Sequence, residues 1–313
     1  LRALELYGYN LEYMLNSNDA TDEQKQEKIS SKDYFASYKD NKWGVIDQEG
    51  NTIIDPSYQE MIIIPNSKND IFLCTYDIDY DNGTYKTKAL NSKNEEIFKD
   101  YEQIEAIENK DKNNNLWYEN NVLKVKKNGK FGIIDTSGKE LLPCQYDEIS
   151  ALEGVKNAIK ISQNGKIGIV TNEGTILLKT EYLDVQALGE DNKSGFIVKG
   201  ENGKYGVADI SNNQVLEQKY DEISKIHQND LYVVKQSGKQ ILIKKDMTEI
   251  LNNGYDEITA ILKNTDNGII YKKQGKYGIM KTSGESRIEP IYEELKEAKS
   301  GIFIAKKDGK YGL

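Results

Sequence analysis

Histidine, cysteine and long apolar runs are scarce in this 313-residue chain, and each shortage excludes a class of protein. One histidine, His227, and two cysteines, Cys74 and Cys144, do not make a zinc site or a Ser-His or Cys-His nucleophile. No run approaches 18 apolar residues, so we expect no membrane insertion. The cysteines lie far apart in apolar contexts, which favours buried free thiols over a disulfide.

Basic clusters are also missing. The formal net charge is −9 and the isoelectric point is about 5.0, so nucleic acid and anionic membrane surfaces are poor partners, because both require patches of Lys and Arg. Hydrophobic residues make up 37% and the mean hydropathy is −0.70, which is low for a compact core. This composition fits thin stacked sheets with a large exposed surface.

What the chain does have is one sequence frame repeated many times, best seen at 129–149, GKFGIIDTSGKELLPCQYDEI. A Gly that follows an aromatic residue in most copies and a Tyr that precedes an acidic pair in most copies stand 14 residues apart in five copies: Gly44/Tyr58, Gly132/Tyr146, Gly168/Tyr182, Gly206/Tyr220 and Gly278/Tyr292. The same offset from Tyr101 and Tyr255 reaches Thr87 and Ile241, where the Gly is replaced. Successive Tyr anchors are separated by 43, 45, 36, 38, 35 and 37 residues. Self-similarity at such a period is the signature of a repeat architecture.

Each copy predicts a three-stranded antiparallel meander. The first strand alternates, as in VLKVK at 122–126, and ends in a pair such as Asn128-Gly129 or Asn202-Gly203 that suits a two-residue hairpin turn. The second strand is the aromatic-Gly run, and a type I turn with Asp first and Gly last follows it at 135–138. The third strand is expected to stop at a proline such as Pro143, which cannot donate to the ladder.

The recurring glycine indicates a bulge or the close approach of another backbone or ring. We expect a Tyr or apolar residue of the neighbouring repeat to pack over it, and the rings of Trp43, Phe131, Tyr205 and Tyr277 to form a stacked row. Such units cannot bury a face alone, so stability should come from interfaces between neighbours.

The pattern resembles the WG (KWG) β-repeat family of bacterial proteins, whose name-giving dipeptide appears as Trp43-Gly44. The resemblance extends from Tyr34 to the C-terminus, with departures at Thr87 and Ile241. It implies a repeat scaffold and no agreed biochemical activity.

Residues 1–33 differ from the rest and predict a short N-terminal helical cap, with a stalk as the alternative; residues 34–313 predict seven repeats plus a truncated eighth. Residues 1–33 offer no Ile-Ile-x-Pro-x-Tyr strand that would complete the eighth unit and close a ring. We therefore expect an all-β protein whose units stack as an open curved β-solenoid, with a seven-bladed β-propeller as the alternative.

Tyrosines and acidic pairs recur in register and would line up as a stripe on stacked repeats. The candidate ligand-binding residues are Tyr146, Asp147, Glu148, Tyr220, Asp221, Glu222, Tyr255, Asp256, Glu257 and Tyr292. A glycosidase needs two carboxylates whose pKa values are pushed apart. A carboxylate present in every copy is more typical of a turn residue that accepts nearby backbone N–H groups.

The long periods indicate insertions near 77–85 and 109–115, which in repeat arrays often emerge on the binding face. The first insertion places Asp77, Asp79 and Asp81 at alternate positions before Gly83, like the start of a calcium loop. Its Gly falls one place late, and Lys88 stands where a bidentate Glu would be needed. Calcium is therefore left as an alternative to a solvated loop, and no other cofactor is expected.

These observations predict a non-catalytic binding or scaffold module, with a protein or a cell-wall or surface glycan as partner. The ligand surface would be the face that carries the Tyr-acidic stripe and the two insertions. The alternative is a carbohydrate-active hydrolase that uses the repeated acids, but the breaks at Thr87 and Ile241 introduce no new acid-base pair. An exported or envelope-associated bacterial protein is favoured, with a cytoplasmic one as the alternative.

Overall fold

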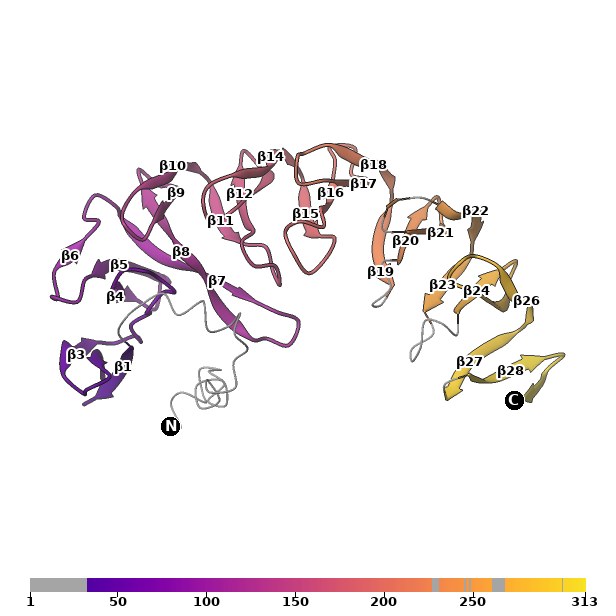
Figure 1. Ribbon diagram of the computed structural model, residues 1–313, viewed down its shortest axis with the longest axis horizontal. Helices are drawn as coiled ribbons and strands as arrows, with labels where there is room; N and C mark the ends of the chain where they lie inside the picture. The colour runs from indigo at the N-terminus through magenta and orange to yellow at the C-terminus, as the bar shows by residue number, and fades with distance from the viewer. Residues whose placement is uncertain (1–32, 227–230, 245, 248, 261–267, 300) are drawn as a thin grey trace. The chain divides into compact units, whose positions relative to one another are not determined.

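The computed structural model describes residues 33–226, 231–244, 246–247, 249–260, 268–299 and 301–313. Every regular element in these residues is a β-strand, and the strands pair antiparallel in eight sheets (Figure 1). The described part contains no helix, and hence none long and apolar enough to cross a membrane. Residues 1–32 of the expected helical cap, and His227, lie outside the described residues.

Two compact units divide the chain, the first comprising residues 1–181 and 189–194 and the second residues 182–188 and 195–313. The first unit carries two three-stranded sheets and two four-stranded sheets. Their strands are β1 (Tyr34–Lys39), β2 (Lys42–Asp47) and β3 (Thr52–Tyr58); β4 (Phe72–Asp79), β5 (Thr84–Leu90) and β6 (Glu96–Ile97); β7 (Gln103–Lys110), β8 (Leu116–Lys127), β9 (Lys130–Asp135) and β10 (Glu140–Tyr146); and β11 (Glu148–Ala151), β12 (Ile159–Gln163), β13 (Lys166–Val170) and β14 (Ile176–Tyr182).

The second unit repeats the four-stranded pattern three times and ends in a three-stranded sheet. Its strands are β15 (Asp184–Ala187), β16 (Phe196–Lys199), β17 (Tyr205–Ala208) and β18 (Gln214–Tyr220); β19 (Glu222–Ile226), β20 (Leu231–Gln236), β21 (Lys239–Lys244) and β22 (Glu249–Tyr255); β23 (Glu257–Ala260), β24 (Ile269–Lys273), β25 (Lys276–Met280) and β26 (Ser286–Tyr292); and β27 (Glu294–Lys299), β28 (Ile302–Lys307) and β29 (Lys310–Gly312).

A fourth strand corrects the predicted three-stranded unit, because the sequence frame is divided between two sheets. Tyr146 ends β10, while Glu148 begins β11, the first strand of the next sheet. The pairing of β11 with β12 joins Ile149 to Ile161, so the apolar residue after the acidic pair belongs to the following sheet. With only 4 residues, β11 is too short for an alternating pattern to mark it in the sequence.

The Asn-Gly turns have the expected geometry in most copies. Asn128 and Gly129 have φ values of 52° and 73°, as a type I′ turn requires, and this hairpin joins Lys127 to Lys130. Asn202-Gly203 is an exception to the prediction. There the paired residues are Lys199 and Tyr205, and a longer loop closes with a 2.9 Å hydrogen bond from Gly203 N to Gly200 O.

The recurring glycine admits the backbone of the last strand of its own sheet, not a residue of the neighbouring repeat as expected. A Cβ built on Gly132 would lie 2.7 Å from Leu142 O and 2.8 Å from Cys144 N. The close approach coincides with a register shift between Leu142 and Tyr146, which is a β-bulge. Pro143 lies inside this bulge. Strand β10 therefore continues past the proline to Tyr146 and does not stop there as expected.

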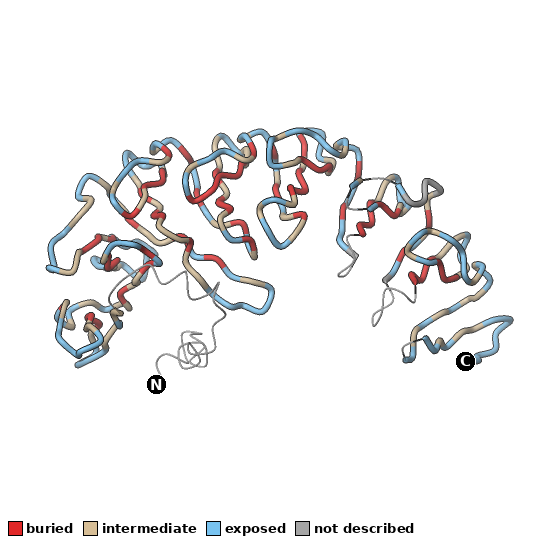
Figure 2. Tube along the Cα trace, viewed as in Figure 1, coloured by how far each residue is buried: buried red, intermediate tan, exposed pale blue. Residues whose placement is uncertain are grey.

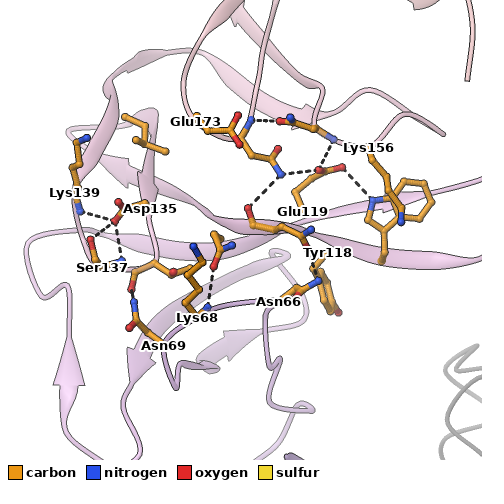
Figure 3. A pocket seen from close by; sticks show the side chains of 17 residues that line it. Asn66, Lys68, Asn69, Tyr118, Glu119, Asp135, Ser137, Lys139, Lys156 and Glu173 are labelled. Atoms are coloured by element: carbon orange, nitrogen blue, oxygen red, sulfur yellow. Dashed lines mark hydrogen bonds between the residues drawn. The ribbon is translucent and has the colours of Figure 1, made fainter. Parts of the chain in front are cut away.

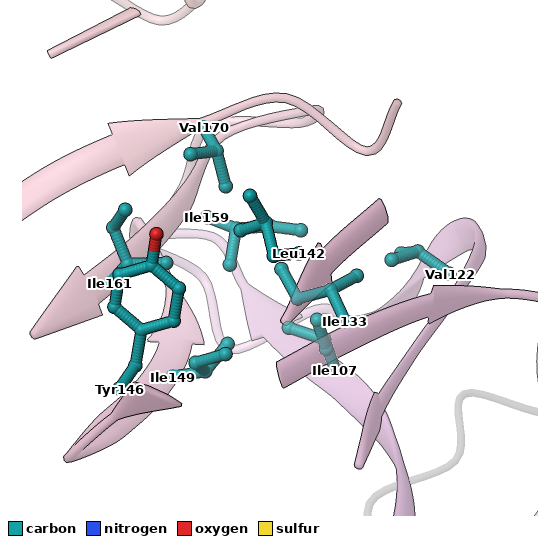
Figure 4. Packing of buried hydrophobic residues seen from close by; sticks show 9 residues of the cluster. All are labelled: Ile107, Val122, Ile133, Leu142, Tyr146, Ile149, Ile159, Ile161 and Val170. Atoms are coloured by element: carbon teal, nitrogen blue, oxygen red, sulfur yellow. The ribbon is translucent and has the colours of Figure 1, made fainter. Parts of the chain in front are cut away.

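Hydrophobic cores lie between successive sheets within each unit, as the repeat pattern predicted (Figure 2). The best defined one brings Ile133 and Leu142 of one sheet against Ile159 and Ile161 of the next (Figure 4). In the second unit an equivalent core joins Tyr220 to Tyr232 and Val234. Both cysteines are free thiols, as predicted, although only Cys74 is fully buried.

The recurring aromatic rings do not stack on one another as predicted. Phe131, Tyr205 and Tyr277 each lie beneath a lysine ammonium of the paired strand, with Nζ 4.8–5.3 Å from the ring centroid. Trp43 instead packs against Tyr38, its cross-strand partner, at 4.9 Å between centroids. Cross-strand cation–π contacts take the place of ring stacking at Phe131, Tyr205 and Tyr277.

Candidate functional site

The first acid of the recurring pair fastens the hairpin turn of the following sheet. Asp147 lies between β10 and β11, where its Oδ2 accepts the backbone N–H of Asn164 at 2.7 Å. Its Oδ1 accepts a hydrogen bond from Lys130 Nζ on β9. These bonds, to Lys130 first and Asn164 second, hold the pKa of Asp147 below its ordinary value. We call this arrangement the turn clamp.

The turn clamp recurs in the second unit, with the lysine in the same register and the backbone donor at either the first or the second residue of the turn. Asp221 accepts Ser237 N at 2.9 Å and Lys204 Nζ; Asp256 accepts Gly275 N at 3.0 Å and Lys239 Nζ; Glu293 accepts Gly309 N at 3.3 Å and Lys276 Nζ at 3.5 Å. The acids therefore serve local backbone groups, as expected of turn residues.

The second acid of each pair begins the next sheet and is exposed. Glu148 and Glu222 face solvent at the first residues of β11 and β19. Glu257 accepts a hydrogen bond from Tyr277 Oη at 3.2 Å, and its side chain also meets Thr259. These exposed carboxylates are accessible to outside partners.

The tyrosines of the stripe are packing residues. Tyr146, Tyr220 and Tyr255 are only 5%, 1% and 8% exposed, and each belongs to a core between two sheets. Burial raises the pKa of Tyr220 and Tyr255. Tyr292 is half-buried. A stacking platform needs exposed ring faces, which these three buried rings do not offer.

The three aspartates of the suspected calcium loop do not converge on one point. Asp77 forms an ion pair with Lys86 at 2.5 Å. Asp79 accepts the backbone N–H groups of Asp81 and Asn82 at 3.0 and 3.1 Å, so it stabilises its own turn. No group of three or more His, Cys, Asp or Glu side chains able to hold a metal occurs in the described part of the chain. These contacts favour the solvated insertion loop over a calcium site.

A polar cavity of about 860 Å³ lies in the first unit, where sequence reasoning placed no site (Figure 3). Its lining is rich in amides and hydroxyls, with Asn66, Asn69, Asn121, Thr136, Ser137 and Asn157 among them. Trp117 and Tyr118 of β8 add aromatic surface, and Lys68, Lys139 and Lys156 add cationic groups. We call it the amide cavity.

The long β7–β8 hairpin creates the amide cavity. Its tip at 111–115 is closed by Asp111, whose Oδ1 accepts the backbone N–H groups of Asn113 and Asn115 at 2.7 and 3.0 Å. The extra length makes β8 a strand of 12 residues, which carries Glu119 beside the cavity. This hairpin contains the second of the two insertions. The long separation of 45 residues between Tyr101 and Tyr146 is the feature of the sequence that indicates it.

Glu119 is a buried carboxylate at the wall of the cavity, with 2% of its surface exposed. Its Oε1 accepts hydrogen bonds from Asn109 Nδ2 at 2.9 Å and Trp117 Nε1 at 3.2 Å. Its Oε2 accepts Asn157 N at 2.9 Å and Asn172 Nδ2 at 3.1 Å. Four donors satisfy the charge without a cation, which fixes the surrounding amides in place.

Asn172 leaves one group unsatisfied at this wall. Its side chain is 8% exposed, and Oδ1 is the buried side-chain polar atom without a hydrogen-bond partner in the described residues. A buried amide oxygen without a donor costs about 1–3 kcal/mol, so a ligand hydroxyl or amine that reached it would recover that free energy. The cavity can thus donate and accept many hydrogen bonds at once.

The sequence comparison gives four matches to a family model described as "WG containing repeat", over residues 43–68, 131–166, 205–239 and 277–311. No curated protein matches the chain at a significant level.

Several solved structures are similar at low identity. One is described as the crystal structure of the eukaryotic initiation factor, with 10% identity over 87% of this chain and 78% of that chain and a TM-score of 0.35. Another is apo AztD from Citrobacter koseri, with 8% identity, 69% and 70% coverage and a TM-score of 0.35. A third is the WD40 beta propeller domain of Doa1, with 9% identity, 79% and 85% coverage and a TM-score of 0.25. Scores of this size do not establish a shared fold.

Proposed function

Since the chain belongs to the WG β-repeat family, we propose that it is a non-catalytic binding module that holds a glycan in the amide cavity. The observation that carries this proposal is the preorganised lining of that cavity, in which Glu119 holds the backbone N–H of Asn157 and the side-chain amide of Asn172. Sugar hydroxyls both donate and accept, so a wall of amides and hydroxyls beside aromatic rings suits them.

The internal use of the repeated acids supports binding over hydrolysis. A glycosidase of the alternative class would need one carboxyl with a raised pKa and one that stays ionised. Asp147, Asp221 and Asp256 all have lowered pKa values from the same causes, a lysine first and a backbone N–H second. Release of reducing ends from a polysaccharide, abolished by Asp147→Asn, would favour the hydrolase.

Binding is tested by filling the cavity. Ser137 is an exposed turn residue on its rim, and Ser137→Trp would occupy the space without removing a buried group. Ser211 holds the same turn position in the second unit, since each serine N–H donates to the preceding Asp Oδ1 at 2.8 Å. Ser211→Trp is therefore a matched control.

The measurement is co-sedimentation with washed bacterial cell walls, followed by calorimetry with soluble oligosaccharides from them. We expect retention on walls that Ser137→Trp abolishes and Ser211→Trp preserves. Capture of one protein from cell extract, with no retention on walls, would make the chain an interaction scaffold and reject the glycan. Retention would also support the proposed exported or envelope location.

We further propose that the sheets continue one after another as an open curved β-solenoid, with a closed seven-bladed propeller as the alternative. The cores between successive sheets within each unit support nearest-neighbour stacking. Small-angle scattering separates the two, because an open array gives a longer maximum dimension than a closed ring of the same mass.

A further inference from the structure

A second pocket, distinct from the amide cavity, lies in the first unit beside the β4–β5 hairpin and has a volume of about 470 Å³. Its lining includes the apolar side chains of Ile63, Leu73 and Ile104, of which Leu73 and Ile104 are buried. Tyr80 and Tyr85 from the first insertion also line it. We call it the tyrosine–glutamate pocket.

Both insertion tyrosines are exposed and tethered through their hydroxyls. Tyr80 and Tyr85 are 69% and 43% exposed. Tyr80 Oη donates to Glu60 Oε1 and Tyr85 Oη donates to Glu105 Oε1, each at 2.9 Å. The bond to Glu105 raises the pKa of Tyr85, which keeps the phenol neutral. The rings are therefore held at the pocket, unlike the buried tyrosines of the stripe.

The charge of the lining has one sign. Glu60, Asp79, Glu105 and Glu108 line the pocket, and its described lining contains no Lys or Arg. Lys124, outside the lining, pairs with Glu105 at 2.7 Å. Carboxylates around aromatic rings and an apolar wall attract a cation, because the ring faces and the carboxylates both carry negative potential.

The pocket coincides with the copy in which the repeat pattern breaks. Thr87 replaces the recurring glycine on β5, and its Oγ1 accepts the backbone N–H of Ile104 at 2.7 Å. This bond joins β5 to β7 and brings Ile104 and Glu105 to the hairpin that carries Tyr85. The substitution at Thr87 and the first insertion together form the pocket.

We propose that the tyrosine–glutamate pocket binds an organic cation, a positively charged nitrogen on a short apolar stem. The apolar wall takes the stem, and Tyr80, Glu60 and Glu108 face the charge. A free alkylamine and a lysine side chain of a partner share this chemistry, and the experiment separates them.

The probes are n-hexylamine hydrochloride, its neutral analogue 1-hexanol, and a lysine pentapeptide with and without Nε-acetylation, each titrated calorimetrically at low salt. We expect the amine to bind and the alcohol not to bind. Tyr80→Ala and Glu60→Gln should each weaken amine binding about tenfold, which corresponds to the loss of a cation–π contact or one charge.

Matched controls lie in the second unit. Tyr311→Ala removes an exposed ring whose hydroxyl also donates to a glutamate, Glu294, at 2.9 Å, and Glu289→Gln removes an exposed acid. Both should leave amine binding unchanged. Three results would each overturn the proposal. They are binding of 1-hexanol as tight as that of the amine, no binding of either amine or peptide at millimolar concentration, and unchanged affinity in Tyr80→Ala and Glu60→Gln. Binding of the peptide but not of hexylamine assigns the site to a protein partner, and the reverse assigns it to a free amine.

Discussion

Asp147 accepts the backbone N–H of Asn164 at 2.7 Å, so an acid at the end of one sheet holds the hairpin turn of the next. Asn164 has a φ of 52°, a conformation that a residue other than glycine adopts only when its surroundings support it. The turn clamp therefore couples neighbouring repeats through a hydrogen bond as well as through the apolar core between them.

The turn clamp predicts unequal roles for two adjacent acids. Asp221→Ala should lower the melting temperature by a few degrees, because Ser237 N and Lys204 lose their acceptor. Glu222→Ala changes the next residue, which is exposed, and should leave the melting temperature unchanged. Circular dichroism melting curves compare the two variants. A loss in Glu222→Ala as large as in Asp221→Ala would contradict the clamp.

Aspartates with lowered pKa values predict loss of stability in acid. Eight are affected: Asp47, Asp79, Asp111, Asp135, Asp147, Asp209, Asp221 and Asp256. Because their folded pKa lies below the ordinary 3.8, the stabilisation is present above that pH and is lost as pH falls through the folded values.

Buried tyrosines predict a loss of stability at high pH. The pKa values of Tyr220 and Tyr255 are raised above 10.0, so their contribution is present below that pH and is lost as pH rises through the folded values. Urea unfolding midpoints between pH 2 and 11 should show a plateau with both edges. A midpoint that stays constant down to pH 2 would contradict the assignment of the aspartates.

Gly206, the recurring glycine on β17, predicts a site intolerant of any side chain. A Cβ on Gly206 would lie 2.5 Å from Leu216 O, so Gly206→Ala should cost about 1–3 kcal/mol of unfolding free energy through overpacking. Gly312, on the last strand, has open space around its Cβ position, and Gly312→Ala is the control. Urea unfolding measures the unfolding free energy of both variants. Equal values would contradict the prediction, because they would show that the bulge accommodates the added methyl group.

The sequence was sufficient for features that one copy contains within itself. Asn128-Gly129 identified its hairpin, and the Asp135 turn forms as predicted, with Gly138 N donating to Asp135 O at 3.0 Å. It was insufficient wherever partners come from different copies. Tyr146 and Glu148 are two residues apart in sequence but belong to different sheets, and the hydrogen bonds of Glu119 reach Asn157 and Asn172. An isolated Glu or Asn in a polar stretch gives no sign of such a partner.

The two free thiols should differ in reactivity. Cys74 is fully buried, and burial raises the pKa of its thiol to about 11, so little thiolate forms at pH 8. Cys144 is partly exposed, although burial raises its pKa as well. N-ethylmaleimide should slowly label Cys144 alone in the folded protein and both residues in urea. Mass spectrometry of peptides measures this, and equal labelling rates in the folded protein would contradict the burial of Cys74.

We expect the replacement of one Glu119 carboxylate oxygen by an NH₂ group to lower the free energy of unfolding substantially. In Glu119→Gln an amide NH₂ replaces an oxygen that accepts from Asn157 N and Asn172 Nδ2, so two donors face a donor. Hydrogen bonds to a charged group contribute about 1.5–3 kcal/mol, and a loss of about 2 kcal/mol in unfolding free energy is expected. Glu173→Gln alters an exposed acid on the rim of the same cavity and should be neutral.

A local signal distinguishes this network from a general loss of packing. The chain has two tryptophans, and only the indole N–H of Trp117 donates to Glu119, at 3.2 Å. In Glu119→Gln the Trp117 indole proton resonance should move upfield, because its charged acceptor is gone, while that of Trp43 stays in place. Movement of both resonances would mean that the substitution disturbs the whole first unit, and movement of neither would mean that Glu119 does not hold the indole.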